Sequence, residues 1–135
     1  MLILKPHSTA YEKNSKDFTK FNLSQFLYLD YDFDLNLVLS KCDLLISDYS
    51  GVIFDFLYFN KQMILFLNDI NKYKKEPGLT FDYKNFKIGY RAYNLNQLLS
   101  LLKKFLASDL KDKFKLSREN YKKKFNVNNN SFITK

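Results

Sequence analysis

Residues 44–66, LLISDYSGVIFDFLYFNKQMILF, decide the fold of this 135-residue chain. The apolar run at 44–46 has the pattern of a strand covered on both faces. Ser50 stands where a helix N-cap is expected, and the helix predicted over 51–59 is apolar around most of its circumference. A second apolar run follows at 63–67. Strand, buried helix and strand in this order predict an α/β domain with a mainly parallel sheet.

Shorter elements precede this stretch. We predict strands at 2–4, closed by Lys5-Pro6, and at 26–29, with a polar loop over 8–22 between them. Asp34 is expected to cap a short helix that reaches Cys42. A lone cysteine cannot form an internal disulfide, and its apolar surroundings favour packing in the core.

The downstream half is predicted to be mainly helical. We expect a helical turn at 69–75, a Pro-Gly turn at 77–78 and an irregular aromatic segment over 81–93. Asn94 should cap a helix with Gln97 as its capping-box partner, and a last helix should start near Asp109. The organisation predicted is one domain over 1–127 and a polar tail over 128–135.

Composition excludes several classes. The 24 aromatic residues (14 Phe and 10 Tyr) and 46% hydrophobic content exclude a disordered chain. No segment reaches the ~18 uninterrupted apolar residues of a membrane span, and the N-terminus lacks a signal-peptide core. We therefore expect a cytoplasmic protein. Asp43 and Asp48 could suggest a metal, but no clustered ligand set accompanies them, so neither metal nor cofactor is expected.

The net charge of +8 is unevenly spread. Residues 1–70 hold six Lys against nine acids, giving −3, whereas 71–135 hold sixteen Lys/Arg against five acids, giving +11. A basic half could attract an anionic membrane surface or a polyanion. Solvated helix faces and an AT-rich coding bias explain it equally well, and no motif for nucleic-acid recognition accompanies the charge.

The segment most informative about chemistry is 47–55, SDYSGVIFD. It joins a strand to a helix, the place where open α/β sheets bind ligands. The backbone N–H groups of such a turn suit a phosphate, Ser50 adds a hydroxyl, and Gly51 allows a close approach. The alternative is that Asp48 and Ser50 only cap the helix.

The sequence holds one histidine, His7, just after the strand at 2–4. A histidine at a strand end can donate to a pyrophosphate or act as an acid or base, and Lys5 is a second counter-charge. The alternative is an ordinary surface histidine. Since parallel strands end at one edge, His7 and the turn at Ser50 are expected to meet one ligand.

The motifs KPH (5–7), SKCDLLISDYSGVIFDFLYFNKQMILF (40–66) and ND followed by Tyr73 resemble the C-terminal part of the CDP-glycerol glycerophosphotransferase family. That family includes the teichoic acid primases and polymerases. The resemblance covers about residues 1–90. It implies a Rossmann-like domain flanked by helices, the donor-binding C-terminal half of a GT-B glycosyltransferase-like fold.

The resemblance also implies roles for individual residues. His7 would contact the donor pyrophosphate, and Ser50 and Gly51 occupy the positions of the family's serine pair at the phosphate. Asp48 and Asp55 would orient the turn and the helix. Asp69 would contact nucleotide or acceptor. The sequence departs from the family pattern at Ser8, Gly51, Gln62 and Pro77-Gly78, and the acceptor half does not appear.

The implied reaction is attack of an acceptor hydroxyl on the β-phosphorus of CDP-glycerol, with release of CMP, in teichoic acid or capsule synthesis at the inner membrane face. The implied partners are the donor, a membrane-linked acceptor, an anionic membrane, and a missing acceptor domain or a second copy. Nucleic acid is not expected. Two alternatives stay open: half of a transferase for a UDP- or CDP-sugar, and a non-catalytic remnant domain.

Overall fold

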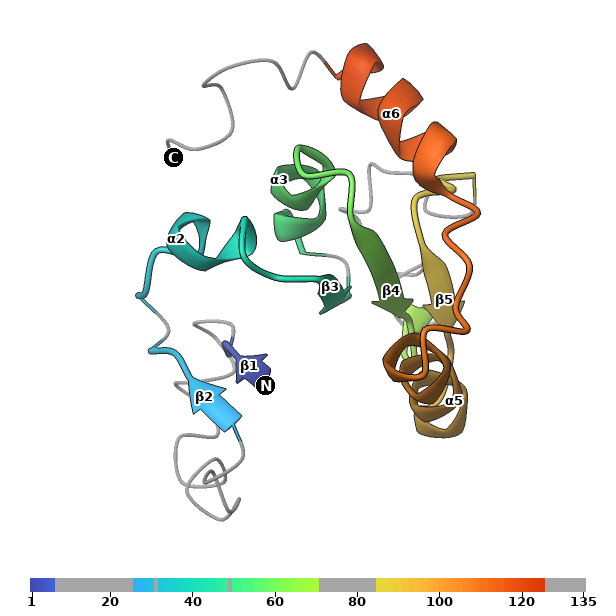
Figure 1. Cartoon of the computed structure of the whole chain (residues 1–135). Helices are drawn as coiled ribbons and strands as arrows, with labels where there is room; N and C mark the ends of the chain where they lie inside the picture. The colour runs from blue at the N-terminus through green and yellow to red at the C-terminus, as the bar shows by residue number, and fades with distance from the viewer. Residues whose placement is uncertain (7–25, 31, 49, 71–84, 126–135) are drawn as a thin grey trace. The chain divides into compact units, whose positions relative to one another are not determined.

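The computed structural model describes residues 1–6, 26–30, 32–48, 50–70 and 85–125 (Figure 1). The chain forms two compact units, Met1–Leu37 and Val38–Lys135. The predictions over 8–22, at 77–78 and for the tail lie outside the described residues. Of the turn predicted over 69–75, only its first two residues are described, and the N–H of Ile70 donates to the carbonyl of Leu67 at 3.4 Å.

The first unit contains a parallel strand pair. Strand β1 (Leu2–Leu4) pairs with β2 (Phe26–Tyr28), and Leu2 lies opposite Phe26. The pairing continues past β2, because the N–H of Leu29 donates to the carbonyl of Leu4 at 2.9 Å. Both strands were predicted from their apolar runs, and the structure confirms them.

Helix α2 (Asn36–Leu39) crosses the boundary between the two units. Oδ1 of Asp34 accepts a hydrogen bond from the N–H of Asn36 at 3.0 Å, so the predicted carboxylate cap is confirmed. The helix ends before Cys42, which is half-buried rather than packed in the core. Its thiol donates to the carbonyl of Val38 at 3.4 Å.

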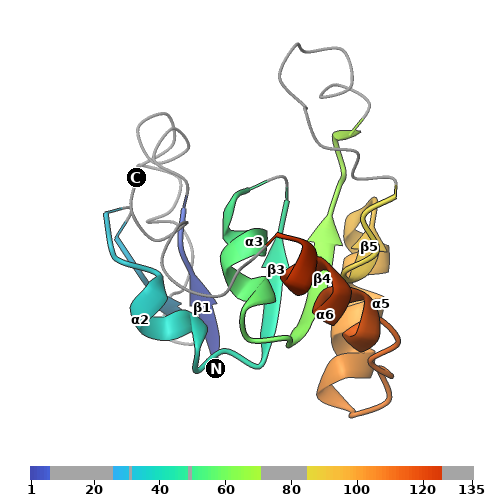
Figure 2. The same cartoon turned by 90° about the horizontal axis from the view of Figure 1, so that it is seen from above.

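The second unit contains a three-stranded parallel sheet in the order β3-β4-β5 (Figure 2). Its strands are β3 (Leu44–Ser47), β4 (Gln62–Phe66) and β5 (Tyr90–Ala92). Ser47 lies opposite Leu65, and Ile64 lies opposite Tyr90. The central strand is the most buried, as an apolar strand with neighbours on both sides should be. The predicted α/β class with a parallel sheet is thereby confirmed.

Helices cover both faces of this sheet. Helix α3 (Val52–Leu57) contacts β3 and α6 (Lys115–Lys124), whereas α5 (Leu95–Leu106) contacts β4 and β5. Figures 1 and 2 show α3 and α6 on one face of the sheet and α5 on the other. The core of the unit consists of the fully buried residues Ile53, Phe56, Leu57, Met63, Ile64, Leu65, Leu67, Phe86, Ile88 and Ala92.

Three predictions about this unit were wrong. Ser50 is not the N-cap of α3: Gly51 occupies that position, and no side chain caps the helix. The last helix starts at Lys115 rather than near Asp109, because the carbonyls of Leu110 and Lys111 are bonded to side chains at the starts of β4 and β5 instead of to a helix. The segment expected to be irregular contains strand β5, whose pairing with β4 is a tertiary contact.

Candidate functional site

The carboxyl ends of the three parallel strands of the second unit open at one edge of the sheet. Asp48 follows β3, Asn68 and Asp69 follow β4, and Tyr93 follows β5. Because strands in a sheet lie about 4.8 Å apart, these residues follow neighbouring strands at one edge of the sheet, the edge at which open α/β sheets bind ligands. Two of the predicted residues, Asp48 and Asp69, therefore share this edge.

The turn from β3 into α3 is shaped by Asp48. Oδ1 of Asp48 accepts a hydrogen bond from the N–H of Ser50 at 3.1 Å, the local bond by which aspartate side chains stabilise turns. This bond uses the Ser50 N–H, which is then not available to a ligand. The predicted role of Asp48 in orienting the turn for a ligand stays a prediction.

Three donors remain at this turn. The carbonyls of Ser50 and Gly51 accept the N–H groups of Ile53 and Phe54 at 3.3 Å and 3.0 Å, which closes the first turn of α3. Within the described residues, no hydrogen bond engages the Ser50 hydroxyl or the N–H groups of Gly51 and Val52. One hydroxyl and two amide donors in three consecutive residues suit an anionic oxygen, because charge-assisted bonds of this kind are strong.

Gly51 leaves room for a ligand. A Cβ built on Gly51 would meet nothing within 4 Å, and its φ of −58° is one that any residue adopts. Its value at this position is therefore the open space above the backbone. A bulky side chain would fill the space through which a phosphate could approach the amide groups.

Asp55 lies one helical turn beyond Gly51, on α3. It is half-buried, and burial raises the pKa of its carboxyl above the ordinary value, because a charged carboxylate loses hydration there. Unlike Asp48, Asp55 makes no hydrogen bond through its side chain among the described residues. Its carboxylate is therefore free to accept a hydroxyl group.

Of the two basic residues predicted for the site, Lys5 belongs to the first unit and His7 is not among the described residues. Lys5 directly follows β1 in the first unit and is half-buried. His7 lies outside the described residues. The expected meeting of His7 with the Ser50 turn therefore stays a prediction.

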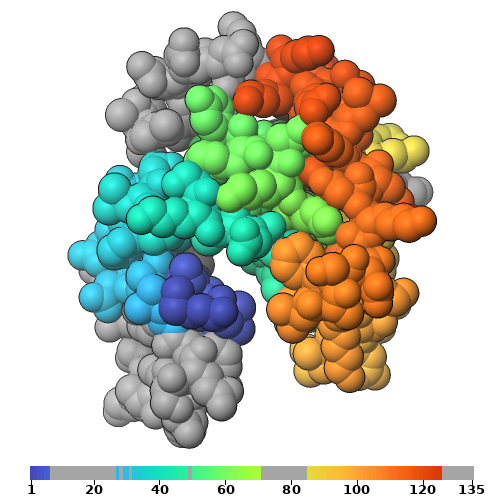
Figure 3. Space-filling model, viewed as in Figure 1, coloured from blue at the N-terminus to red at the C-terminus, as the bar shows by residue number. Residues whose placement is uncertain are grey.

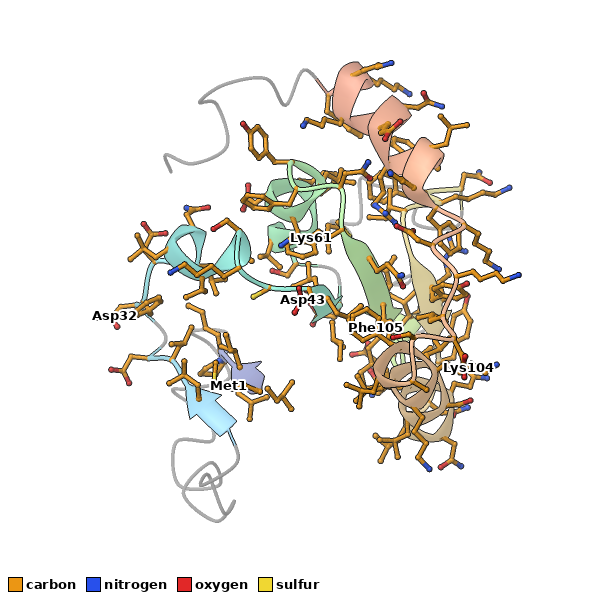
Figure 4. The ribbon with its side chains drawn as sticks, in the orientation of Figure 1. Met1, Asp32, Asp43, Lys61, Lys104 and Phe105 are labelled. Carbon is orange, nitrogen blue, oxygen red and sulfur yellow. The ribbon has the colours of Figure 1, made fainter. Side chains whose placement is uncertain are left out.

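A lysine clamp that sequence reasoning missed supports the start of β3 (Figure 4). The Lys61 ammonium donates to the carbonyls of Ser40 and Cys42 at 2.7 Å and 2.8 Å, tying the chain before β3 to the chain before β4. Burial raises the pKa of the Cys42 thiol, with the nearby Lys61 charge opposing that rise. The residues in this clamp are about twenty positions apart, and no local pattern predicts such a contact.

Sequence reasoning also missed β5 and with it Tyr93, which follows the carboxyl end of that strand. The available signal was Asn94, correctly predicted as a cap: its Oδ1 accepts from the N–H of Gln97 at 2.9 Å. In turn, Oε1 of the Gln97 side chain accepts a hydrogen bond from the N–H of Tyr93 at 2.8 Å. The cap indicates where α5 begins, whereas the strand before it is defined by its pairing with β4.

Two other kinds of site are absent from the described ranges. Across that part of the chain, no three His, Cys, Asp or Glu side chains gather as metal ligands would. Nor does any described helix combine the length and apolar character needed to cross a bilayer.

The described chain is thus an α/β protein with a parallel sheet and, after the strand β3, a turn whose hydroxyl and amide donors are free. Comparison with known sequences identifies the family within this class. The chain belongs to the CDP-glycerol:poly(glycerophosphate) glycerophosphotransferase family, whose sequence profile matches residues 1–131. The family resemblance stated from the sequence motifs is confirmed. No solved structure matches the chain.

Three similar proteins are teichoic acid enzymes. The chain is 36% identical over 54% of its length to a teichoic acid poly(ribitol-phosphate) polymerase of Bacillus spizizenii. It is 32% identical over 67% of its length to a teichoic acid poly(glycerol phosphate) polymerase of Bacillus subtilis. A teichoic acid glycerol-phosphate primase of Bacillus subtilis is 30% identical over 65%. The aligned regions cover only 12%, 13% and 21% of these relatives.

Proposed function

We propose that this chain is the donor-binding part of an enzyme that transfers glycerol phosphate, or a related polyol phosphate, from a CDP-activated donor to a hydroxyl acceptor. The observation that carries the proposal is the Ser50 turn in a chain of this family. There a hydroxyl and two amide groups are free to bind a phosphate. The relatives' names include both glycerol and ribitol phosphate, so the polyol is left as a class.

The proposed reaction is a displacement at phosphorus. The acceptor oxygen bonds to the β-phosphorus of CDP-glycerol, the bond from that phosphorus to the bridging oxygen breaks, and CMP departs with the bridging oxygen. The acceptor hydroxyl loses its proton to a base. The contribution of the protein is to stabilise charge on the phosphates, which is the main task of such sites.

The proposal assigns a task to each site residue. Ser50, Gly51 and the adjoining amide of Val52 bind phosphate oxygens, and Asp48 holds the turn in place. His7 donates a proton to the departing phosphate, and Lys5 adds positive charge. Asp55 accepts a donor hydroxyl group, and Asp69 contacts the nucleotide or the acceptor.

The same proposal covers architecture and location. The parallel sheet with helices on both faces corresponds to the C-terminal, nucleotide-binding half of a GT-B fold. An acceptor domain, on this or another polypeptide, completes the enzyme. The acceptor is a membrane-linked polymer of the teichoic acid or capsule type, which places the reaction at the inner face of the cell membrane.

The test is an NMR titration of the isotope-labelled full chain with CDP-glycerol, CDP, CMP and UDP-N-acetylglucosamine. We expect the CDP compounds to shift the amide signals of Gly51 and Val52. Ser50→Ala should weaken this binding about tenfold, the value of one or two charge-assisted bonds. Ser100→Ala, at an exposed serine on α5, is the matched control and should leave binding unchanged.

The other outcomes are equally informative. A preference for the UDP-sugar would replace the proposal with a sugar transferase. A dispersed spectrum that no nucleotide perturbs would identify a non-catalytic remnant. In His7→Ala, donor binding that is unchanged would remove His7 from the site.

A further inference from the structure

A row of exposed lysines runs from the end of α5 to the start of α6. Its members are Lys104, Lys111, Lys113 and Lys115, which we call the basic ridge, and all four are exposed. They belong to one continuous segment of the second unit, which lies on the surface in Figure 3. Four exposed like charges within twelve residues favour the binding of an anion, because an anion reduces their mutual repulsion.

The acids of the same region do not neutralise the ridge. The carboxylate of Asp112 is bonded to the buried guanidinium of Arg118. The carboxylate of Glu119 accepts the side-chain amide of Asn60 at 2.9 Å. Among residues 104–124, only Asp109 remains as an acid without such an engagement. The positive charge of the ridge is therefore largely uncompensated by its own chain.

Tyr90 on the edge strand β5 fixes the middle of the ridge. Its hydroxyl donates to the carbonyl of Lys111 at 2.8 Å, and its ring packs edge-on against Phe114 with 5.1 Å between centroids. The Lys113 ammonium lies 4.9 Å from the centroid of the Tyr90 ring. These contacts fix the ridge at the start of β5, which lowers the entropy lost on binding.

A lipid bilayer fits this surface poorly. The exposed leucines of α5, namely Leu95, Leu99 and Leu106, form one stripe. At 3.6 residues per turn, Lys104 lies roughly 140–180° around the helix from that stripe. Figure 4 shows Lys104 pointing away from the sheet-facing Phe105. A flat membrane could not take up the leucine stripe and the ridge together, as an interfacial helix requires.

Nucleic acid bases also lack a place to stack. Two aromatic rings lie at the ridge, those of Phe114 and Tyr90; they pack against each other, and the Lys113 ammonium lies over both. Single-strand binders combine basic charge with open aromatic faces. The ridge has the positive charge but no open aromatic face. It therefore suits an anion that is recognised through its phosphates alone.

We infer that the basic ridge binds the phosphate-rich backbone of the poly(polyol phosphate) chain that serves as acceptor or product. This inference rests on the proposed function and extends it to a second surface. A flexible polymer with a phosphate in every repeat can follow a bent row of lysines, which a sheet of lipid cannot. Leu110 and Lys111 are bonded to Gln62 and Tyr90, the first residues of β4 and β5, so the ridge lies at the opposite end of the sheet from the Ser50 turn and would hold a part of the polymer away from its growing end.

The experiment measures binding of a fluorescently labelled synthetic poly(glycerol phosphate) oligomer to the full chain by anisotropy at low salt. The ridge variant is Lys111→Gln/Lys115→Gln, and the matched control is Lys41→Gln/Lys87→Gln, at exposed lysines of the same unit. Each removes two charges. We expect the ridge variant to bind about tenfold more weakly and the control less than about twofold. Added salt should erase most of the difference.

An equal loss of oligomer affinity in the two variants would overturn the inference, because net charge, and not the position of the lysines, would then explain the binding. Stronger ridge-dependent binding to anionic lipid vesicles, or to an oligonucleotide of the same charge, would overturn it in favour of that partner. CDP-glycerol titration of the same samples separates the two proposals. Donor binding without ridge-dependent polymer binding rejects only the ridge, and the reverse result rejects only the donor site.

Discussion

Arg118 on α6 is hydrogen-bonded twice to Asn60, in the turn that leads into β4. Its Nε donates to the Asn60 side-chain oxygen at 3.0 Å, and its Nη2 donates to the Asn60 carbonyl at 3.2 Å. Asn60 has a φ of 49°, in the left-handed region that asparagine tolerates better than most residues. The same guanidinium reaches the carbonyl of Ile88 at 3.3 Å and the carboxylate of Asp112. One buried side chain therefore joins four separate segments of the second unit.

Replacing Arg118 should destabilise the fold strongly. Arg118→Met leaves the Asp112 carboxylate and the Asn60 carbonyl without their donor, and we expect a loss of about 3 kcal/mol in the free energy of unfolding. Lys124→Met, at an exposed position of the same helix, should change it by less than about 0.5 kcal/mol. Urea unfolding followed by circular dichroism measures both. Similar values for the two variants would show that Arg118 is not the joint of this unit.

Gly89 should not tolerate a side chain. A Cβ on Gly89 would lie 2.5 Å from the carbonyl oxygen of Met63, which belongs to the central strand and cannot move away freely. We expect Gly89→Ala to cost about 2 kcal/mol of stability. Gly51→Ala is the control: its space is open, so stability should hold or rise by about 0.5 kcal/mol. Thermal unfolding measures both variants. Equal shifts in their unfolding temperatures would show that the close contact at Gly89 is not what limits its substitution.

The cap of α5 can be tested in isolation. Asn94→Ala removes the bond from Oδ1 to the N–H of Gln97 and should cost about 1 kcal/mol. Asn96 is exposed and lies two residues beyond Asn94, inside the helix. Asn96→Ala removes the same kind of side chain from a position that does not cap the helix, so it should not destabilise the fold. Chemical denaturation compares them. A loss in Asn96→Ala as large as that in Asn94→Ala would assign the effect to surface chemistry instead of capping.

The pH dependence of stability should report Asp55. Burial raises the pKa of this carboxyl, so the folded chain holds the proton more tightly than the unfolded chain does. Stability contributed by the protonated form is then lost as pH rises from the ordinary pKa through the raised one. We expect Asp55→Asn to match the natural chain in acid and to be more stable near neutrality. Asp43→Asn, at an exposed carboxylate, is the reference for loss of surface charge alone.

A difference between Asp55→Asn and the natural chain that stayed constant from acid to neutral pH would contradict the burial effect. The measurement is the free energy of unfolding at a series of pH values. Donor affinity of the same variant is a separate readout, because the proposed hydroxyl contact needs the carboxylate.

Most of the architecture could be predicted from local patterns. The strands of the first unit, the run Leu44–Ser47 and the central strand were each recognisable as short apolar runs. The caps at Asp34 and Asn94 were recognisable because a cap depends on residues two to three positions away. The edge strand at Tyr90–Ala92 was not, since it has only three residues and no apolar run. Its strand character comes from pairing with β4, which no local pattern encodes.

The candidate site divides in the same way. The segment around Ser50 was found from its position between a strand and a helix. Its details required the structure: Asp48 accepts a hydrogen bond from the Ser50 N–H, and Gly51, not Ser50, is the N-cap of α3. His7 lies outside the described residues, so its predicted contribution to the site remains a prediction.

The sequence by itself determined the α/β class, the family and the chemical type of the turn, because hydrophobic periodicity, capping residues and a contiguous motif are all local properties. Tertiary structure decided what holds the second unit together and which donors its turn leaves free. The Arg118 joint, the Lys61 clamp and the close approach of Gly89 to Met63 each bring together residues about twenty or more positions apart. Such contacts arise only when chain segments pack, and the chain order alone does not specify them.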